Sequence, residues 1–210
     1  MPSLEFRSFS LQALLLLTAV AAPLLASCGG GSSSPGVPPG PSFTQYAVSN
    51  GMAPSGPITV GSDGALWLIA TSKYGNQGSL SRVTTTGAAT MEFSSDPSQI
   101  VPFGACTTGS DGAVWFFTIG AGFGRITPSG NVRFFPLPTN AYVQAMTVGP
   151  DGAVWFTDTG THALGRITTA GAVTEYPTTL LPYLSGGIAT GPDGALWFTS
   201  YAGRPTPGPP

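Results

Sequence analysis

The chain has 210 residues and a formal net charge of −2, and charged side chains occupy only 8% of its positions, against roughly 25% in an average soluble domain. Its 30 glycines and 21 prolines favour an exported, turn-rich β protein over a cytosolic helical one. Because no basic excess is present, the sequence lacks the electrostatic footprint of nucleic-acid binding, and we expect no nucleic-acid partner.

Residues 1–27 have the features of an export signal peptide. Their apolar stretch, from about Leu11 to Ala22, is too short to span a bilayer comfortably. The segment is followed by Cys28 in the sequence LASC, which resembles the lipobox of bacterial lipoproteins and implies lipidation of the Cys28 sulfur. The alternative is an ordinary signal peptide with a chance cysteine. We expect a bacterial envelope protein, lipid-anchored to the membrane on its exported side, periplasmic or extracellular.

Residues 28–42 contain Cys28 and the sequence GGGSSSPGVPPGP. A segment of this composition cannot bury a core, so we expect a disordered tether between the membrane and the folded part. The second cysteine, Cys106, is at an apolar position that corresponds to isoleucine or methionine in the other repeats. We expect it to be a buried small hydrophobe, neither a nucleophile nor a disulfide partner. No zinc-ligand spacing is present, so no metal site is predicted.

One phrase occurs four times between residues 43 and 201. It reads GSDGALWL from Gly61, GSDGAVWF from Gly109, GPDGAVWF from Gly149 and GPDGALWF from Gly191, and its aspartates are separated by 48, 40 and 42 residues (63 to 111, 111 to 151, 151 to 193). A period in the forties indicates a repeat architecture. Asp-Gly predicts a hairpin turn, and the apolar run after it predicts a strand buried on both faces. Four unrelated hairpins of a sandwich are the alternative.

Each unit is predicted to hold four strands, which in the third unit are residues 145–149, 153–158, 164–169 and 172–177. Arginines recur in the third strand of the first three units, and we interpret them as structural, in ion pairs or stem packing. Residues 43–46 resemble a fourth strand, and the last unit stops after its second. The fold class is therefore all-β, an incomplete β-propeller of about three and a half four-stranded blades of an expected six to seven.

Residues 202–210 form a proline-rich tail in which Pro205 replaces an apolar strand residue, and proline is poor inside a sheet. We therefore expect the product of a truncated or frame-shifted gene. An open arc leaves two apolar blade faces bare, each on the order of 500 Å². Such a chain is expected to be unstable, to aggregate, or to self-associate through these faces.

The unit GPDGALWFT, then GRIT, then TEYP resembles the virginiamycin B lyase (streptogramin lyase) family over about Phe43 to Tyr201. The resemblance implies a seven-bladed propeller and a magnesium-dependent carbon–oxygen lyase, which opens a cyclic depsipeptide antibiotic by elimination and so confers antibiotic resistance. Elimination needs a base, enolate stabilisation and an acid. The resemblance places histidines just before the first strand of a unit, and a glutamate after the second.

The histidine-equivalent positions are Gly56, Gly104, Gln144 and Gly186. The glutamate-equivalent positions are Thr71, Ile119, Thr159 and Tyr201. None carries the group that the chemistry needs, so no catalytic residue is predicted. We expect no cofactor in this chain, and Mg²⁺ only if the lyase hypothesis holds for a full-length protein.

Four residues are candidates for a ligand-binding face. His162 is the single histidine of the chain, and with Asp158 it would lie on the face that ligands are expected to approach, where such a pair can ligate a metal or move a proton. A solvated loop histidine is the alternative. Tyr142 and Tyr183 precede first strands and are expected to line the same face, with packing at the rim as the alternative.

Three functions remain open from the sequence. The first is an envelope-anchored binding or structural propeller that lacks the lyase catalytic set. The second is the N-terminal part of an active streptogramin B lyase. The third is an adhesion or carbohydrate-binding module, so that the partner is either a small molecule or a glycan. The sequence names no ligand, because a repeat indicates a fold more than a chemistry.

Overall fold

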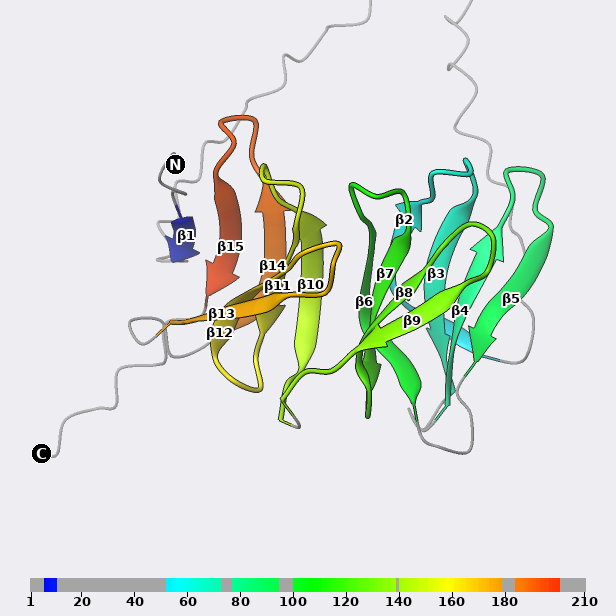
Figure 1. The fold of residues 1–210 in the computed structure, drawn as a ribbon, viewed down its shortest axis with the longest axis horizontal. Coiled ribbons are helices and arrows are strands. Elements are labelled where there is room, and N and C mark those ends of the chain that lie inside the picture. The colour runs from blue at the N-terminus through cyan, green and yellow to red at the C-terminus, as the bar shows by residue number, and fades with distance from the viewer. Residues whose placement is uncertain are drawn as a thin grey trace, which may run out of the picture. The chain divides into compact units, whose positions relative to one another are not determined.

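The computed structural model describes residues 6–10, 52–72, 77–94, 100–138, 140–178 and 184–200. Every regular element in these ranges is a β-strand (Figure 1), which confirms the all-β prediction. Within them, no helix of the length and apolarity needed to cross a bilayer is found. The tether, the strand expected at residues 43–46 and the proline-rich tail lie outside the described residues, as does most of the expected signal peptide.

Three four-stranded antiparallel sheets follow one another along the chain, and each is one blade of an incomplete β-propeller. Blade 1 contains β2 (Ala53–Val60), β3 (Leu66–Thr71), β4 (Gly78–Val83) and β5 (Ala89–Ser94). Blade 2 contains β6 (Val101–Thr108), β7 (Val114–Ile119), β8 (Gly122–Ile126) and β9 (Val132–Phe135). Blade 3 contains β10 (Val143–Val148), β11 (Val154–Asp158), β12 (Ala163–Ile167) and β13 (Val173–Pro177). The order of strands in each sheet is their order in the sequence, as the repeat predicted.

A further sheet contains β14 (Leu184–Thr190) and β15 (Leu196–Ser200), the first two strands of the fourth unit. On its other side β15 pairs in parallel with β1 (Phe6–Ser10), so that β1 takes the place that a third strand has in blades 1 to 3. The sequence predicted β14 and β15. It did not predict the pairing of β1, whose residues fall within the expected export signal.

Each Asp-Gly motif forms the turn between the first two strands of its sheet. In the first copy, the Gly61 amide donates to the Ala65 carbonyl at 2.8 Å and the Gly64 amide donates to the Gly61 carbonyl at 3.0 Å, and the other three copies repeat both bonds. The aspartate side chain accepts a bond from the backbone amide two residues on, at 3.1 to 3.2 Å. This is the local bond by which aspartate favours turns.

The hydrophobic core lies between successive blades. Trp67 and Leu80 of blade 1 cluster with Phe116 and Ile126 of blade 2, and Trp115 and Phe123 of blade 2 cluster with residues of blade 3 such as Phe156. All five residues of β11 are buried, as expected for a strand that is covered on both faces. Each blade is thus stabilised by its neighbours as well as by its own hydrogen bonds.

Hydroxyl groups also connect successive blades at the Asp-Gly turns. Ser62 Oγ donates to the Gly112 carbonyl at 2.6 Å, and Ser110 Oγ donates to the Gly152 carbonyl at 2.5 Å. In the third copy the serine is replaced by Pro150. There a bond from Thr190 Oγ1 to the Val148 carbonyl, 2.6 Å long, connects the sheets.

Cys106 is buried in β6 and pairs with Phe116 of β7. The equivalent positions in the other sheets are Ile58, Met146 and Ile188, each of which pairs with the residue that follows the tryptophan in the next strand. The Cys106 Sγ lies 3.4 Å from the Pro57 carbonyl, and burial raises the pKa of the thiol to about 12. The prediction of a buried small hydrophobe is confirmed.

Cys106 is therefore expected to resist alkylation in the folded chain, because the thiolate is the reactive species and almost none forms at neutral pH. Mass spectrometry after iodoacetamide treatment measures the modification, and the same treatment in urea serves as the positive control. Rapid modification of the folded chain at pH 7 would contradict the burial of this side chain.

Candidate ligand-binding site

The first strand of every sheet is irregular near its start, at the end of the sheet opposite the Asp-Gly turns. The pairing shifts between Pro54 and Ile58, Pro102 and Cys106, Val143 and Ala145, and Leu184 and Ile188. The positions for which the resemblance implied histidines fall in or beside these irregularities, and we call them the bulge row: Gly56, Gly104, Gln144 and Gly186. The prediction that they precede the first strand is wrong, since in blade 3 this strand begins at Val143 rather than at Ala145.

The bulge row runs from blade to blade without interruption. A Cβ atom at Gly56 would lie 2.6 Å from the Gly104 carbonyl oxygen, one at Gly104 would lie 3.0 Å from the Val143 carbonyl oxygen, and one at Gly186 would lie 3.3 Å from the Gln144 Cβ. Gly104 and Gly186 have φ values of 71° and 104°, where a side chain such as histidine is strained. The row therefore presents backbone groups and the Gln144 amide.

The positions at which the resemblance implied a glutamate lie at the same end of the blades. Thr71 and Ile119 end their strands. Thr159 follows β11, where its hydroxyl donates to the Tyr142 carbonyl at 3.1 Å, and Tyr201 is outside the described residues. Like the bulge row, these positions carry no group that ionises near neutral pH.

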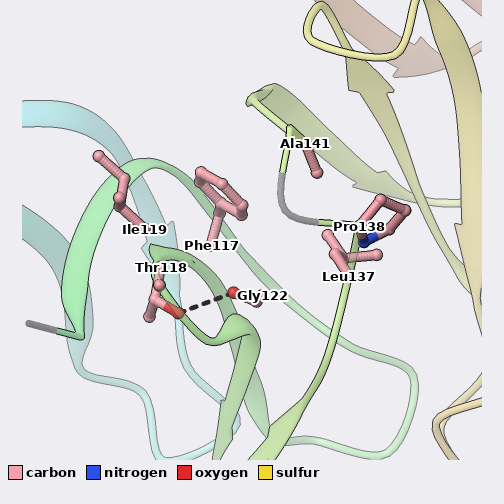
Figure 2. A pocket seen from close by; sticks show the side chains of 8 residues that line it. Phe117, Thr118, Ile119, Gly122, Leu137, Pro138 and Ala141 are labelled. Carbon is pink, nitrogen blue, oxygen red and sulfur yellow. Dashed lines mark hydrogen bonds between the residues drawn. The ribbon is translucent and has the colours of Figure 1, made fainter. Parts of the chain in front are cut away.

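A cavity of about 300 Å³ opens at this end, between the β7–β8 turn of blade 2 and the connection that leads from β9 to blade 3. Figure 2 shows Phe117 and Ile119 of blade 2 on one side and Leu137 and Pro138, which lead toward blade 3, on the other. The hydroxyl of Thr118, which also lines the cavity, donates to the Gly122 carbonyl at 2.8 Å. Five of the eight lining residues have apolar side chains, which suits an apolar part of a small ligand.

Asp158 and His162 lie in different surroundings. Asp158 is fully buried, and its Oδ1 accepts bonds from the backbone amides of Tyr142 (2.8 Å), Gly160 (2.8 Å) and Thr161 (3.1 Å). His162 is exposed and has a φ of 54°, and its carbonyl accepts bonds from the amide and hydroxyl of Thr178. Asp158 thus holds the loops together through backbone amides, a role that the sequence did not predict.

Tyr142 is half-buried, and its ring lies 5.4 Å from that of Phe103 in a tilted contact between blades 2 and 3. This contact is the rim packing that the sequence left open as the alternative to ligand stacking. Tyr183, the other tyrosine proposed for this face, is outside the described residues. Ala141, next to Tyr142, lines the cavity beside the β7–β8 turn.

Blades 1 to 3 each contain a repeated polar triad at the Asp-Gly end. In blade 3, Asp151 Oδ1 accepts a bond from Trp155 Nε1 at 2.9 Å, and Asp151 Oδ2 accepts one from Arg166 Nε at 2.6 Å. Arg82 with Asp63 and Arg125 with Asp111 form the same ion pair at 2.5 and 2.6 Å. Burial tends to raise the pKa of Asp63 and Asp151, but hydrogen bonds from arginine and tryptophan outweigh it and lower both values.

The triads confirm the structural role predicted for the arginines, whereas the aspartates were predicted only as turn formers. The constant offset of four residues from Asp to Trp, followed by a recurring arginine in the third strand, was the sequence signal for the triad. In the described part of the chain, no three His, Cys, Asp or Glu side chains gather in a way that could hold a metal ion.

Comparison with known proteins agrees with this architecture. The model of the virginiamycin B lyase family matches residues 36–205. Virginiamycin B lyase from Staphylococcus aureus is 36% identical, with a TM-score of 0.57, and the match covers 68% of this chain and 47% of that one. A catalytically inactive variant of that enzyme, solved with quinupristin, gives the same values. A streptogramin B lyase is 26% identical, with a TM-score of 0.55 and coverage of 74% and 65%.

No curated protein matches the chain significantly. The chain spans about half the length of the Staphylococcus aureus enzyme, and the family match takes in all four Asp-Gly motifs. The family match therefore spans all the blades that the structure describes, together with their repeated motifs. The chain belongs to the virginiamycin B lyase family.

Proposed function

We propose that this chain is an envelope-anchored binding propeller of the virginiamycin B lyase family, and that it does not by itself carry out the elimination. The bulge row carries this proposal: three glycines and a glutamine occupy the positions at which the family resemblance implies catalytic histidines. An elimination needs a group that can take a proton near neutral pH. Glycine and glutamine supply backbone and amide hydrogen bonds, which bind a ligand but do not deprotonate it.

The cavity beside the β7–β8 turn supports a binding role. It lies at the same end of the blades as the bulge row, and it offers apolar side chains together with the backbone of Gly120 and Gly122. A cyclic peptide antibiotic combines apolar side chains with amide groups, so it matches both features. Envelope anchoring rests on the apolar segment before Cys28 and on the LASC sequence.

The purified chain is expected to bind quinupristin without opening its ring. Chromatography after incubation with the antibiotic and Mg²⁺ measures ring opening, and tryptophan fluorescence measures binding. Ile119→Ala is expected to weaken binding about tenfold, because the cavity would lose apolar contact. Val132→Ala is the matched control, since both side chains are partly exposed, at 41% and 36%, but only Ile119 lines the cavity. Equal effects of the two substitutions would contradict the proposed site.

A second function is favoured by the 36% identity to an enzyme of about twice the matched length. In this alternative, the chain forms part of an active lyase whose catalytic groups come from further blades. Magnesium-dependent ring opening by the chain alone would overturn the first proposal. Ring opening only after fusion to the remaining blades of the Staphylococcus aureus enzyme would support the second.

A further inference from the structure

Two carboxylates share one face of blade 3. Asp158 ends β11 and pairs with Ala163 of β12, while Glu175 of β13 pairs with Gly165 of β12. Directly paired residues of antiparallel strands point to the same face, and residues two apart in one strand do so as well. Both carboxylates therefore lie on one face of the sheet, diagonally across Ala163 and Gly165, and the Phe156 ring covers Gly165 on the same face.

Three oxygen atoms in this region are buried, and none of them has a hydrogen-bond partner in the described part of the chain: Asp158 Oδ2, Thr161 Oγ1 and Glu175 Oε1. The Asp158 residue is fully buried, and its other carboxylate oxygen is already occupied by three backbone amides. Burial raises the pKa of Glu175, and the charge of Asp158 raises it further. Buried carboxylate oxygens without donors are unfavourable unless a cation or a proton compensates them.

Blade 2 shows what occupies these positions when the site is absent. Thr118 corresponds to Asp158, because each lies three residues after its tryptophan, and Phe134 corresponds to Glu175, because each pairs with a glycine of the third strand. The ring of Phe134 packs against Phe116, at 6.5 Å between centroids. An apolar contact thus fills in blade 2 the place that blade 3 gives to a carboxylate.

We propose that Asp158, Thr161 and Glu175 form a binding site for a hard divalent cation, Ca²⁺ in particular. All three groups offer oxygen, the ligand atom that Ca²⁺ prefers, and two carboxylates balance its charge. Water molecules complete the six to eight ligands that Ca²⁺ takes. The bound ion connects β11, the loop after it and β13, and so fixes the outer strand of blade 3. With only two carboxylates, we expect a dissociation constant on the order of 10⁻⁴ to 10⁻³ M, as in extracellular modules.

Thermal unfolding of the full chain tests this site. In Ca²⁺ at about a hundred times the dissociation constant, the melting temperature is expected to rise on the order of 5 °C above its value in EDTA. In EDTA, the Glu175→Gln variant is expected to melt at a higher temperature than the wild type, because repulsion between the two carboxylates is removed. In Ca²⁺, the variant is expected to melt at a lower temperature than the wild type. Thr161→Val retains both charges and is expected to reduce the Ca²⁺ effect.

Asp193→Asn is the matched control, because it removes the same charge from a turn in a different sheet and should leave the Ca²⁺ effect intact. Terbium luminescence reports binding directly. Added Ca²⁺ should displace bound Tb³⁺ from the wild type, whereas the Glu175→Gln variant should bind little Tb³⁺ to begin with. The proposal is overturned if Ca²⁺ does not raise the melting temperature of the wild type, or if it raises that of Glu175→Gln equally. It is also overturned if Glu175→Gln is the more stable protein in both solutions, which would mean that a proton compensates the pair. None of these outcomes depends on the proposed antibiotic binding.

Discussion

Trp115→Ala is expected to lower the free energy of unfolding by roughly 3–5 kcal/mol, the usual cost of removing a large aromatic side chain from a core. The Trp115 side chain is fully buried between blades 2 and 3, and its ring stacks on Phe135 at 5.2 Å. Its Nε1 donates to Asp111 at 3.3 Å. The loss is large relative to the roughly 5–15 kcal/mol that stabilise a typical domain. Urea unfolding followed by circular dichroism measures it.

Two variants distinguish the sources of this loss. Trp115→Phe keeps most of the ring but removes the donor to Asp111, so it should be much less destabilising than Trp115→Ala. Trp197→Ala removes the equivalent ring from the fourth unit, where it is only half-buried, and should also be less destabilising. If Trp197→Ala were as destabilising as Trp115→Ala, the core between blades 2 and 3 would not be the main source of stability.

Gly165→Ala is expected to destabilise the chain by about 1–3 kcal/mol, because it adds a methyl group to a filled core. A Cβ atom at this position would overlap the ring of Phe156. That ring is itself held by Phe123, at 4.7 Å between centroids in an edge-to-face contact, so it has little freedom to move. Denaturant midpoints of the variant and of the wild type measure the difference.

A double-mutant cycle tests the cause of this effect. Phe156→Leu removes the ring that the new methyl group meets, so Gly165→Ala should be less harmful in that background. Gly194→Ala is the control for the backbone, because no atom lies within 4 Å of its Cβ position and only its φ of 75° opposes a side chain. A cost that is unchanged in the Phe156→Leu background would refute the steric explanation.

The sequence predicted the blades because their determinants are local and repeated. Asp-Gly turns and the buried apolar runs after them define β3, β7, β11 and β15, and the third and fourth strands of blade 3 lie within two residues of their predicted bounds. The start of the first strand was harder to predict: in blade 3 it lies at Val143 rather than Ala145, where the resemblance implied a loop. In the structure these residues form irregular strand, since neighbouring blades approach too closely for larger side chains.

The candidate site was less predictable, because it depends on contacts between residues that are distant in the sequence. Asp158 was identified as a ligand-face residue, but its burial depends on the approach of Tyr142 from another loop. Its relation to Glu175 depends on the register of β12 between them. Neither fact follows from the spacing of residues 158 and 175. The cavity next to Ile119 likewise depends on the connection from β9 to β10 lying beside the β7–β8 turn.

The hydroxyl bonds between Asp-Gly turns have an evolutionary consequence. The Ser62 bond to the Gly112 carbonyl and the Ser110 bond to the Gly152 carbonyl use the same motif position as donor and the same motif position as acceptor. The second motif does both, because Ser110 donates to the third motif and the Gly112 carbonyl accepts from the first, whereas proline replaces the donor in the third and fourth motifs. In-frame duplication of the second unit, about forty residues long, would create a junction that already has both bonding partners. Duplication of a serine-containing unit such as the second is thus expected to add a blade to this chain without first evolving a new bond between the turns.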